Sequence, residues 1–158
     1  MFRDVARKKQ SLPKEDCIEI LKSQVRGVLS IQGDDGYPYG LPMNHWYNEA
    51  DGKVYFHSGK YGHKIDSLAR CGKVSFCVMD EGTSQPDHWS KDFRSVIVFG
   101  KLEILKDHEK AIEMVKKLSY HFVNDAAYIE AEIRQSGVNT LCLCLTPEHM
   151  TGKLVHEK

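Results

Sequence analysis

The sequence lacks an excess of charge of either sign. Its 158 residues carry 22 lysines and arginines against 22 aspartates and glutamates. A surface without a net field has no broad attraction for nucleic acid or for anionic membranes, so any binding of an anion must be local. We therefore expect neither a nucleic-acid partner nor a membrane partner.

Long apolar runs are also missing. No stretch approaches the roughly 20 apolar residues that cross a bilayer, and the first residues, Met1 to Lys9, contain no apolar signal core. These two absences predict a cytoplasmic protein. The sequence has no internal repeat, low-complexity stretch or convincing linker, so we expect a single domain over residues 1–158.

Paired metal-binding or disulfide motifs are absent from the sequence as well. The five cysteines include no Cys-x-x-Cys pair, and Cys142 and Cys144, two apart in an apolar strand pattern, favour a packing role. His45 and His57 could share one face of a sheet, but two histidines without a carboxylate at fixed spacing are more typical of core or cofactor contacts than of a metal site. We predict no metal site.

The sequence does contain a regular alternation of helix and strand signals. Helical periodicity between start and stop signals predicts helices over residues 14 to about 26, 64–70, 107–120 and 126–135. Alternating apolar residues between turn signals predict strands over residues 28–31, 37–47, 53–58, 73–80, 94–106 and 139–145. About six antiparallel strands with helices in their connections indicate an α+β barrel.

Two irregular features interrupt this pattern. Gly100 lies inside the long predicted strand, where glycine is disfavoured, and therefore predicts a bulge or bend. Residues 81–92 are polar and read as a long loop, a length that is usually functional or disordered.

The most informative segment joins a strand to a helix. The apolar strand Val54–Ser58 runs into Gly59, Gly62 and a helix start that carries His63 and Lys64. Glycines let the backbone approach a ligand closely, the first N–H groups of a helix point outward unpaired, and a lysine there adds a full charge. A solvated lysine is the ordinary interpretation of Lys64 alone, but its place after two glycines favours a phosphate site.

Seven short motifs occur in one order along nearly the whole chain: Arg3-Asp4, Gly33–Tyr39, Tyr55–Ser58, Gly62–Lys64, Val74–Val78, Phe93–Gly100 and Thr151–Lys153. Together they resemble the flavin-binding split-barrel proteins related to pyridoxamine 5'-phosphate oxidase, and within these the 5-nitroimidazole-resistance (Nim) branch. The resemblance implies an α+β fold with a six-stranded antiparallel split β-barrel, of the Greek-key, FMN-binding type, and flanking helices.

The resemblance also implies a homodimer with a flavin at the subunit interface, FMN or alternatively FAD. When the family's site is carried over residue by residue, the residues implied to surround the flavin phosphate are His57, Ser58, Gly59, His63 and Lys64. The isoalloxazine ring and ribityl chain of the flavin would lie along Leu41, Pro42, Met43 and Asn44. The residues that would approach the flavin from the partner subunit, or line the substrate side, are Trp89, Phe93, Arg94 and Ser95.

The implied function is that of a flavin-dependent oxidoreductase that reduces a small acceptor, such as a nitroaromatic compound of the 5-nitroimidazole type. In such proteins the cofactor carries the electron chemistry, so no catalytic side chain is predicted. The sequence has no Gly-x-Gly-x-x-Gly fold for a bound nicotinamide, so a reduced nicotinamide or other donor would dock transiently. Two alternatives remain: a non-catalytic flavin carrier or sensor, and a haem-binding protein with His45, His57 or His63 as axial ligand.

Overall fold

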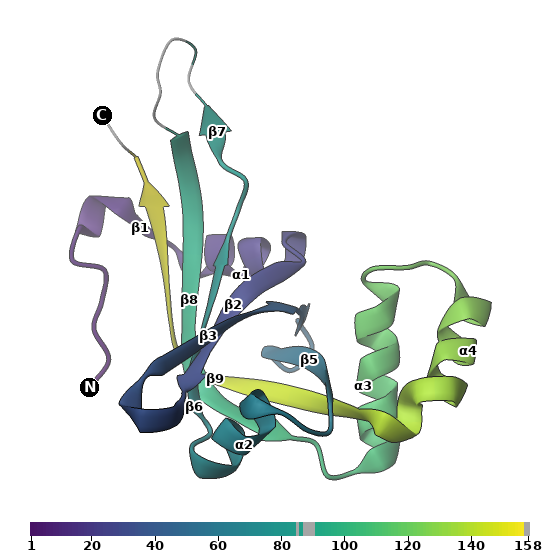
Figure 1. The fold of residues 1–158 in the computed structure, drawn as a ribbon. Helices are drawn as coiled ribbons and strands as arrows, with labels where there is room; N and C mark the ends of the chain where they lie inside the picture. The colour runs from purple at the N-terminus through teal and green to yellow at the C-terminus, as the bar shows by residue number, and fades with distance from the viewer. Residues whose placement is uncertain (85, 87–90, 157–158) are drawn as a thin grey trace.

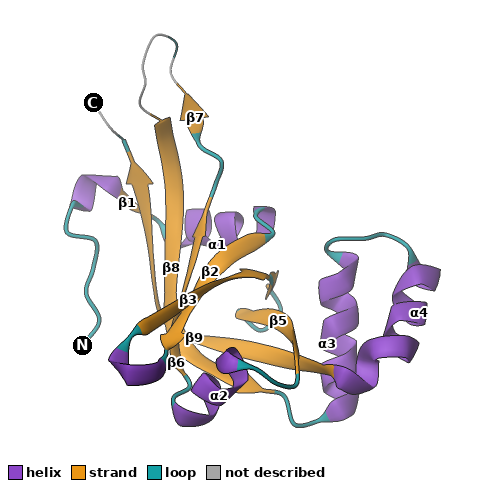
Figure 2. Cartoon of the chain, viewed as in Figure 1, coloured by secondary structure: helices purple, strands orange, loops and turns teal. Residues whose placement is uncertain are grey.

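The structure of the chain is a computed structural model that describes residues 1–84, 86 and 91–156. Its centre is an antiparallel sheet with the strand order β3-β2-β6-β8-β9-β5-β4, which curls into a half-barrel and brings β3 close to β5 (Figure 1). Helices flank this sheet (Figure 2). The predicted α+β class and antiparallel split-barrel architecture are confirmed.

The elements alternate along the chain much as the sequence pattern predicts. The strands of the sheet are β2 (Arg26–Gln32), β3 (Pro38–Asn44), β4 (Trp46–Asn48), β5 (Lys53–Gly59), β6 (Lys73–Met79), β8 (Lys91–Ile104) and β9 (Thr140–Val155). The short strands β1 (Ser11–Leu12) and β7 (Thr83–Ser84) pair with β9 and β8. The α-helices are α1 (Lys14–Ser23), α2 (His63–Arg70), α3 (His108–Tyr120) and α4 (Ala126–Ser136), and the 3-10 turns are η1 (Lys8–Gln10), η2 (Asp34–Gly36) and η3 (Gly137–Asn139).

The core fills the concave side of the curled sheet. Leu29, Phe76 and Val98 lie on neighbouring strands in one register row, and all three are fully buried. The rings of Phe56 and Phe76 meet edge to face at 5.0 Å across the interior. This arrangement follows from the period-two alternation of the strands, which puts every second side chain on the core face.

Helices α3 and α4 lie together on the outside of β5 and β9 (Figure 1). Tyr55, Cys142 and Cys144 form a second buried cluster there with side chains of α3, among them Met114 and Leu118. The packing role predicted for the two cysteines is therefore confirmed: both are buried free thiols, and burial raises the pKa of Cys142 to about 12.

The predicted strand 37–47 is wrong in one respect, because the chain turns at His45 and the segment forms two strands. The His45 ring is fully buried, its Nε2 donates to the Leu21 carbonyl at 2.9 Å, and its backbone N–H donates to the Val25 carbonyl. These contacts with the end of α1 bend the chain from β3 into β4. Because they depend on tertiary structure, the strand pattern did not contain them.

The last strand is longer than predicted, since β9 continues past residue 145 to Val155. The polar and proline-containing stretch at 146–149 ends the apolar alternation, yet it still pairs with β8: Thr146 with Lys101, Pro147 with Gly100 and His149 with Phe99. The register shifts next to Gly100, which confirms the predicted bulge. A Cβ on Gly100 would lie 2.1 Å from the Thr146 carbonyl oxygen, so only glycine permits this close approach.

No helix among the described residues is both long enough and apolar enough to cross a membrane.

Folding stability should depend on pH through His45. Burial lowers the pKa of this ring to about 4, because the charged imidazolium would be desolvated; the buried Nδ1 also has no hydrogen-bond partner among the described residues that would accept from a second N–H. The ring is neutral in both states above about pH 6.5; below it, the unfolded chain takes up a proton that the native protein does not. Stability should therefore fall between about pH 6.5 and 4, by about 3 kcal/mol from this group.

The measurement is urea unfolding across this pH range. His45→Gln keeps a donor for the Leu21 carbonyl and removes the titration, so its stability should change less with pH than that of the wild type. His108→Gln, at an exposed position on α3, is the control. Equal pH dependence in wild type and His45→Gln would contradict the assignment.

Candidate functional site

The candidate site centres on Lys64, a half-buried cation. Its Nζ lies 3.5 Å from the thioether sulfur of Met43, and burial lowers its pKa. Within the described ranges, no carboxylate forms an ion pair with this ammonium group. A partly desolvated charge without a counter-charge is costly, so this position favours the arrival of an anion.

The local sequence fixes Lys64 at a helix start. Gly62 caps α2 with a φ of 114°, a backbone conformation that glycine adopts without strain. The N–H groups of Ile65 and Asp66 both donate to the Gly62 carbonyl, which leaves the two N–H groups before them without intrahelical partners. The positive end of the helix dipole thus adds to the lysine charge.

His57 lies beside this cation. It is on the face of β5 that carries Tyr55, and it remains exposed where that face passes the end of α3. Partial burial and the nearby charge of Lys64 lower the pKa of the His57 ring. Two of the residues that the resemblance assigns to a phosphate, His57 and Lys64, are therefore brought together.

His63, predicted to join them, has other partners. Its ring stacks on Tyr39 with 4.2 Å between ring centroids, and Nε2 lies 3.3 Å from a carboxylate oxygen of Asp34. Arg70 pairs with the same carboxylate at 2.7 Å. The side chain of His63 is thus held toward the β2–β3 turn, and its backbone N–H is the group that remains free for an anion.

Ser58 and Gly59 also differ from each other in their surroundings. The Ser58 side chain is buried on the core face of β5, opposite to His57, and its hydroxyl donates to the Gly59 carbonyl at 2.9 Å. A Cβ on Gly59 would meet nothing within 4 Å, so that position is open. A contact of the Ser58 hydroxyl with a phosphate stays a prediction.

The four predicted residues of β3 alternate between its two faces. Leu41 and Met43 point toward the core, whereas Pro42 and Asn44 point outward. The Asn44 side-chain oxygen accepts from Nε of Arg26, opposite it on β2, at 2.8 Å. Arg26 is a cation near the site that sequence reasoning missed; only its place at the start of a strand, opposite the end of β3, could have indicated it.

The described residues among those predicted to approach from the partner subunit or the substrate side lie away from Lys64 within one chain. Ser95 pairs with Lys153 on β9, whereas His57 pairs with Cys142 near the other end of that strand. Arg94 makes two ion pairs of 2.8 Å, one with Asp80 and one with Glu19. Phe93 neighbours them on β8. Trp89 lies outside the described residues.

A cavity of about 440 Å³ adjoins the candidate site. Asn44 and His57 line one side of it, and the other walls come from α3, α4, η3 and the start of β9. Most of its lining surface is apolar. From Asn44 and His57 the cavity extends toward α3 and α4. The sequence pattern assigned no function to α3 or α4.

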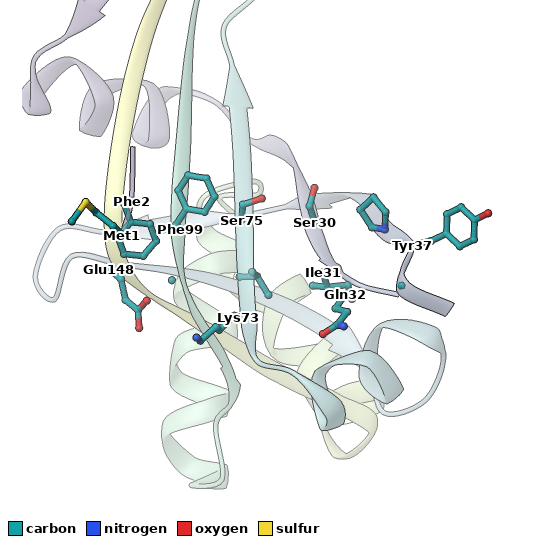
Figure 3. A pocket seen from close by; sticks show the side chains of 14 residues that line it. Met1, Phe2, Ser30, Ile31, Gln32, Tyr37, Lys73, Ser75, Phe99 and Glu148 are labelled. Atoms are coloured by element: carbon teal, nitrogen blue, oxygen red, sulfur yellow. The ribbon is translucent and has the colours of Figure 1, made fainter. Parts of the chain in front are cut away.

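A second hollow, of about 600 Å³, lies on the convex face of the sheet (Figure 3). Figure 3 shows Ser30, Ser75 and Phe99 on adjacent strands, and the register places them in one row. Phe2 covers one end, with its ring stacked on His149 at 5.0 Å. Neither Lys64 nor any residue of α3 or α4, the helices that cover the outside of β5 and β9, is among its lining residues.

The three histidines considered as axial haem ligands differ in how accessible their rings are. His45 is fully buried and hydrogen-bonded to Leu21, so it is not available as an axial ligand. His63 is engaged by Asp34 and Tyr39, which leaves His57. No group of three or more histidine, cysteine or acidic side chains suited to a metal ion occurs within the part of the chain that the structure describes.

Comparison with known proteins gives matches at the level of family and fold. A sequence model of the family described as pyridoxamine 5'-phosphate oxidase matches residues 13–154. None of the curated proteins matches the chain. Among solved structures, a candidate 5-nitroimidazole antibiotic resistance protein from Bacteroides thetaiotaomicron is 24% identical, with a TM-score of 0.78 over 91% of this chain and 86% of that one.

Two further solved structures are similar. An FAD-binding protein from Mesorhizobium loti is 21% identical, with a TM-score of 0.66 over 93% of this chain and 98% of that one. An FAD and heme binding protein from Mycobacterium smegmatis is 21% identical, with a TM-score of 0.73 over 94% of this chain and 74% of that one. At these identities the likeness establishes the split-barrel fold.

The contrast between Lys64 and Arg94 gives a stability prediction. Arg94→Met leaves Asp80 and Glu19 without their partner and should lower the free energy of unfolding by about 1–3 kcal/mol. Lys64→Met keeps the apolar stem and removes an unpaired charge, so it should change stability by less than about 0.5 kcal/mol. Urea unfolding of the protein without added ligand measures both. An equal loss in the two variants would show that Lys64 has a structural partner.

Proposed function

The chain belongs to the pyridoxamine 5'-phosphate oxidase family, and from this premise we propose that it is a flavin-binding oxidoreductase that reduces a small acceptor. The observation that carries the proposal is Lys64, a half-buried ammonium group without a carboxylate partner among the described residues, beside His57 and the first N–H groups of α2. This arrangement suits one phosphate group.

The residues present fit the phosphate of a flavin. A phosphate monoester carries about −1.5 to −2 charges, and hydrogen bonds to charged groups contribute roughly 1.5–3 kcal/mol each. Lys64 would supply the charge, His57 would donate once protonated against the phosphate, and the free N–H groups of α2 would donate without reorganisation. Backbone groups along Leu41–Asn44 would hold the ring. When bound, the flavin supplies the electron-transfer chemistry.

The descriptions of the structurally similar proteins support the proposed acceptor and cofactor. One is a candidate 5-nitroimidazole antibiotic resistance protein, and two bind FAD. We propose a nitroaromatic compound as the type of acceptor and a reduced nicotinamide as the donor. A bound flavin without turnover, as in a carrier or sensor, is the alternative that an activity assay separates. Of the three histidines considered for the haem alternative, His45, His57 and His63, His57 is the accessible one.

We also propose that two chains form a dimer across the convex face of the sheet. Val28, Cys77 and Ile97 form one row across β2, β6 and β8 on this face, and Val28 and Ile97 are exposed. A continuous apolar face of this kind is typical of an interface. A dimer would also let Phe93 and Ser95 of a second chain approach the flavin, since they lie far from Lys64 in their own chain.

Removing the phosphate contacts should abolish flavin binding. The double variant Lys64→Ala and His57→Ala should remain folded and bind flavin at least about 100-fold more weakly, because two charge-assisted contacts are lost. Fluorescence titration of the apoprotein measures the affinity. Lys101→Ala, an exposed lysine on β8, is the control and should bind as the wild type does.

Full flavin retention in the double variant would overturn the phosphate assignment. Anaerobic turnover with NADH or NADPH and a 5-nitroimidazole then tests the activity itself. Flavin that is bound with an affinity near the wild type's but never reduced by any donor would favour the carrier or sensor.

The dimer has a separate test. Ile97→Glu puts a charge into the proposed interface and should convert the dimer to a monomer in sedimentation experiments, with loss of flavin. Ile97 is 37% exposed in the single chain, so the substitution is compatible with its fold. Val138→Glu, at a 71% exposed apolar position on η3, is the matched control. A dimer that persists in Ile97→Glu would place the interface elsewhere.

A further inference from the structure

A cavity lies between the sheet and the helix pair α3–α4, beside the proposed phosphate site. Its volume is about 440 Å³, within the range of about 300–1,000 Å³ that is typical of ligand pockets. Two of its lining residues belong to the proposed flavin site: His57, a proposed phosphate contact, and Asn44, at the end of the β3 segment proposed to lie along the flavin. A flavin phosphate bound at His57 would therefore lie next to the cavity.

The walls of the cavity are suited to a flat apolar ring. Side chains from both helices line it, among them Phe122 and Val123 after α3 and Tyr128 on α4. These three remain exposed in the single chain, at 37%, 39% and 53%. Large apolar side chains gathered around one cavity and left open to solvent are typical of a binding site rather than of a helix packed for stability alone.

Polar groups occur at defined places on the same walls. The hydroxyls of Ser119 and Thr140 already donate to backbone carbonyls: Ser119 to Val115 within α3, and Thr140 at the start of β9 to Ser136 at the end of α4. The carboxylate of Glu132 on α4 has no hydrogen-bond or ion-pair partner within the described ranges and lines the cavity. It can accept hydrogen bonds from hydroxyl or amino groups, as a ribose or an adenine presents.

We infer that this cavity binds the adenosine half of FAD, so that the flavin of this protein is FAD. The diphosphate would lie at His57 and Lys64, the flavin half along β3, and the adenosine between α3 and α4. This inference rests on the proposed flavin binding. An acceptor in the cavity is less favoured, because Leu41, Pro42 and Met43 of the segment proposed to hold the ring do not line the cavity, whereas the proposed phosphate contact His57 does.

The experiment compares the affinities of the apoprotein for FAD, FMN and AMP by calorimetry. FAD should bind at least about tenfold more tightly than FMN, and AMP should compete with FAD. Ser119→Trp fills the cavity from α3; its FAD affinity should fall to the level of FMN, while FMN affinity stays unchanged. Equal affinity of the wild-type apoprotein for FAD and FMN would overturn the inference and leave the proposed function intact.

A second variant tests the inference even if Ser119→Trp does not fold. Glu132→Ala removes an exposed carboxylate and should weaken FAD about three- to tenfold with no effect on FMN. Gln135→Ala, an exposed residue on α4 that does not line the cavity, is its matched control. Unchanged FAD affinity in Glu132→Ala and in a folded Ser119→Trp would overturn the inference. If neither flavin binds the wild type, the proposed function fails, and this inference with it.

Discussion

The hydrogen bond from His45 to the Leu21 carbonyl sets the geometry on which the site depends. It lies at the corner where the chain leaves β3 and enters β4, and it ties that corner to the end of α1. Since β4 pairs with β5, the corner brings the end of β3 close to β5. Met43 and Asn44 at that end thereby reach Lys64 and the cavity beside His57. A neutral buried imidazole is the condition for this arrangement.

Desolvation of a charge distinguishes Lys64 from the paired cations of the chain. The chain has no net charge, and two of its partly buried cations form ion pairs: Arg94 with Asp80 and Glu19, and Lys116 with Glu130. Lys64 has no ion pair within the described ranges, and burial lowers its pKa. In a neutral protein, such a desolvated and unpaired charge is more informative than composition, because an anionic ligand that binds there removes its cost.

Local chemistry made much of this predictable from the sequence. Periodicity located most helices and strands, Gly100 indicated the bulge, and the glycines before His63 and Lys64 indicated the helix start. The corner at His45 was not predictable, because it depends on a contact with α1. For the same reason sequence reasoning missed Arg26, whose partner Asn44 is a neighbour only once β2 and β3 are in register.

The engagement of Arg94 constrains what its segment can contribute to a second chain. The guanidinium group is held by two carboxylates of its own protomer, so moving it to a phosphate would leave Asp80 and Glu19 unpaired. The segment would therefore contribute the apolar ring of Phe93 and the hydroxyl of Ser95, which suit a ring system better than a phosphate. The charge for the proposed flavin phosphate would then come from the chain that carries Lys64. In the proposed dimer, the flavin would be divided between two chains: one would bind the phosphate, and the other would cover the ring.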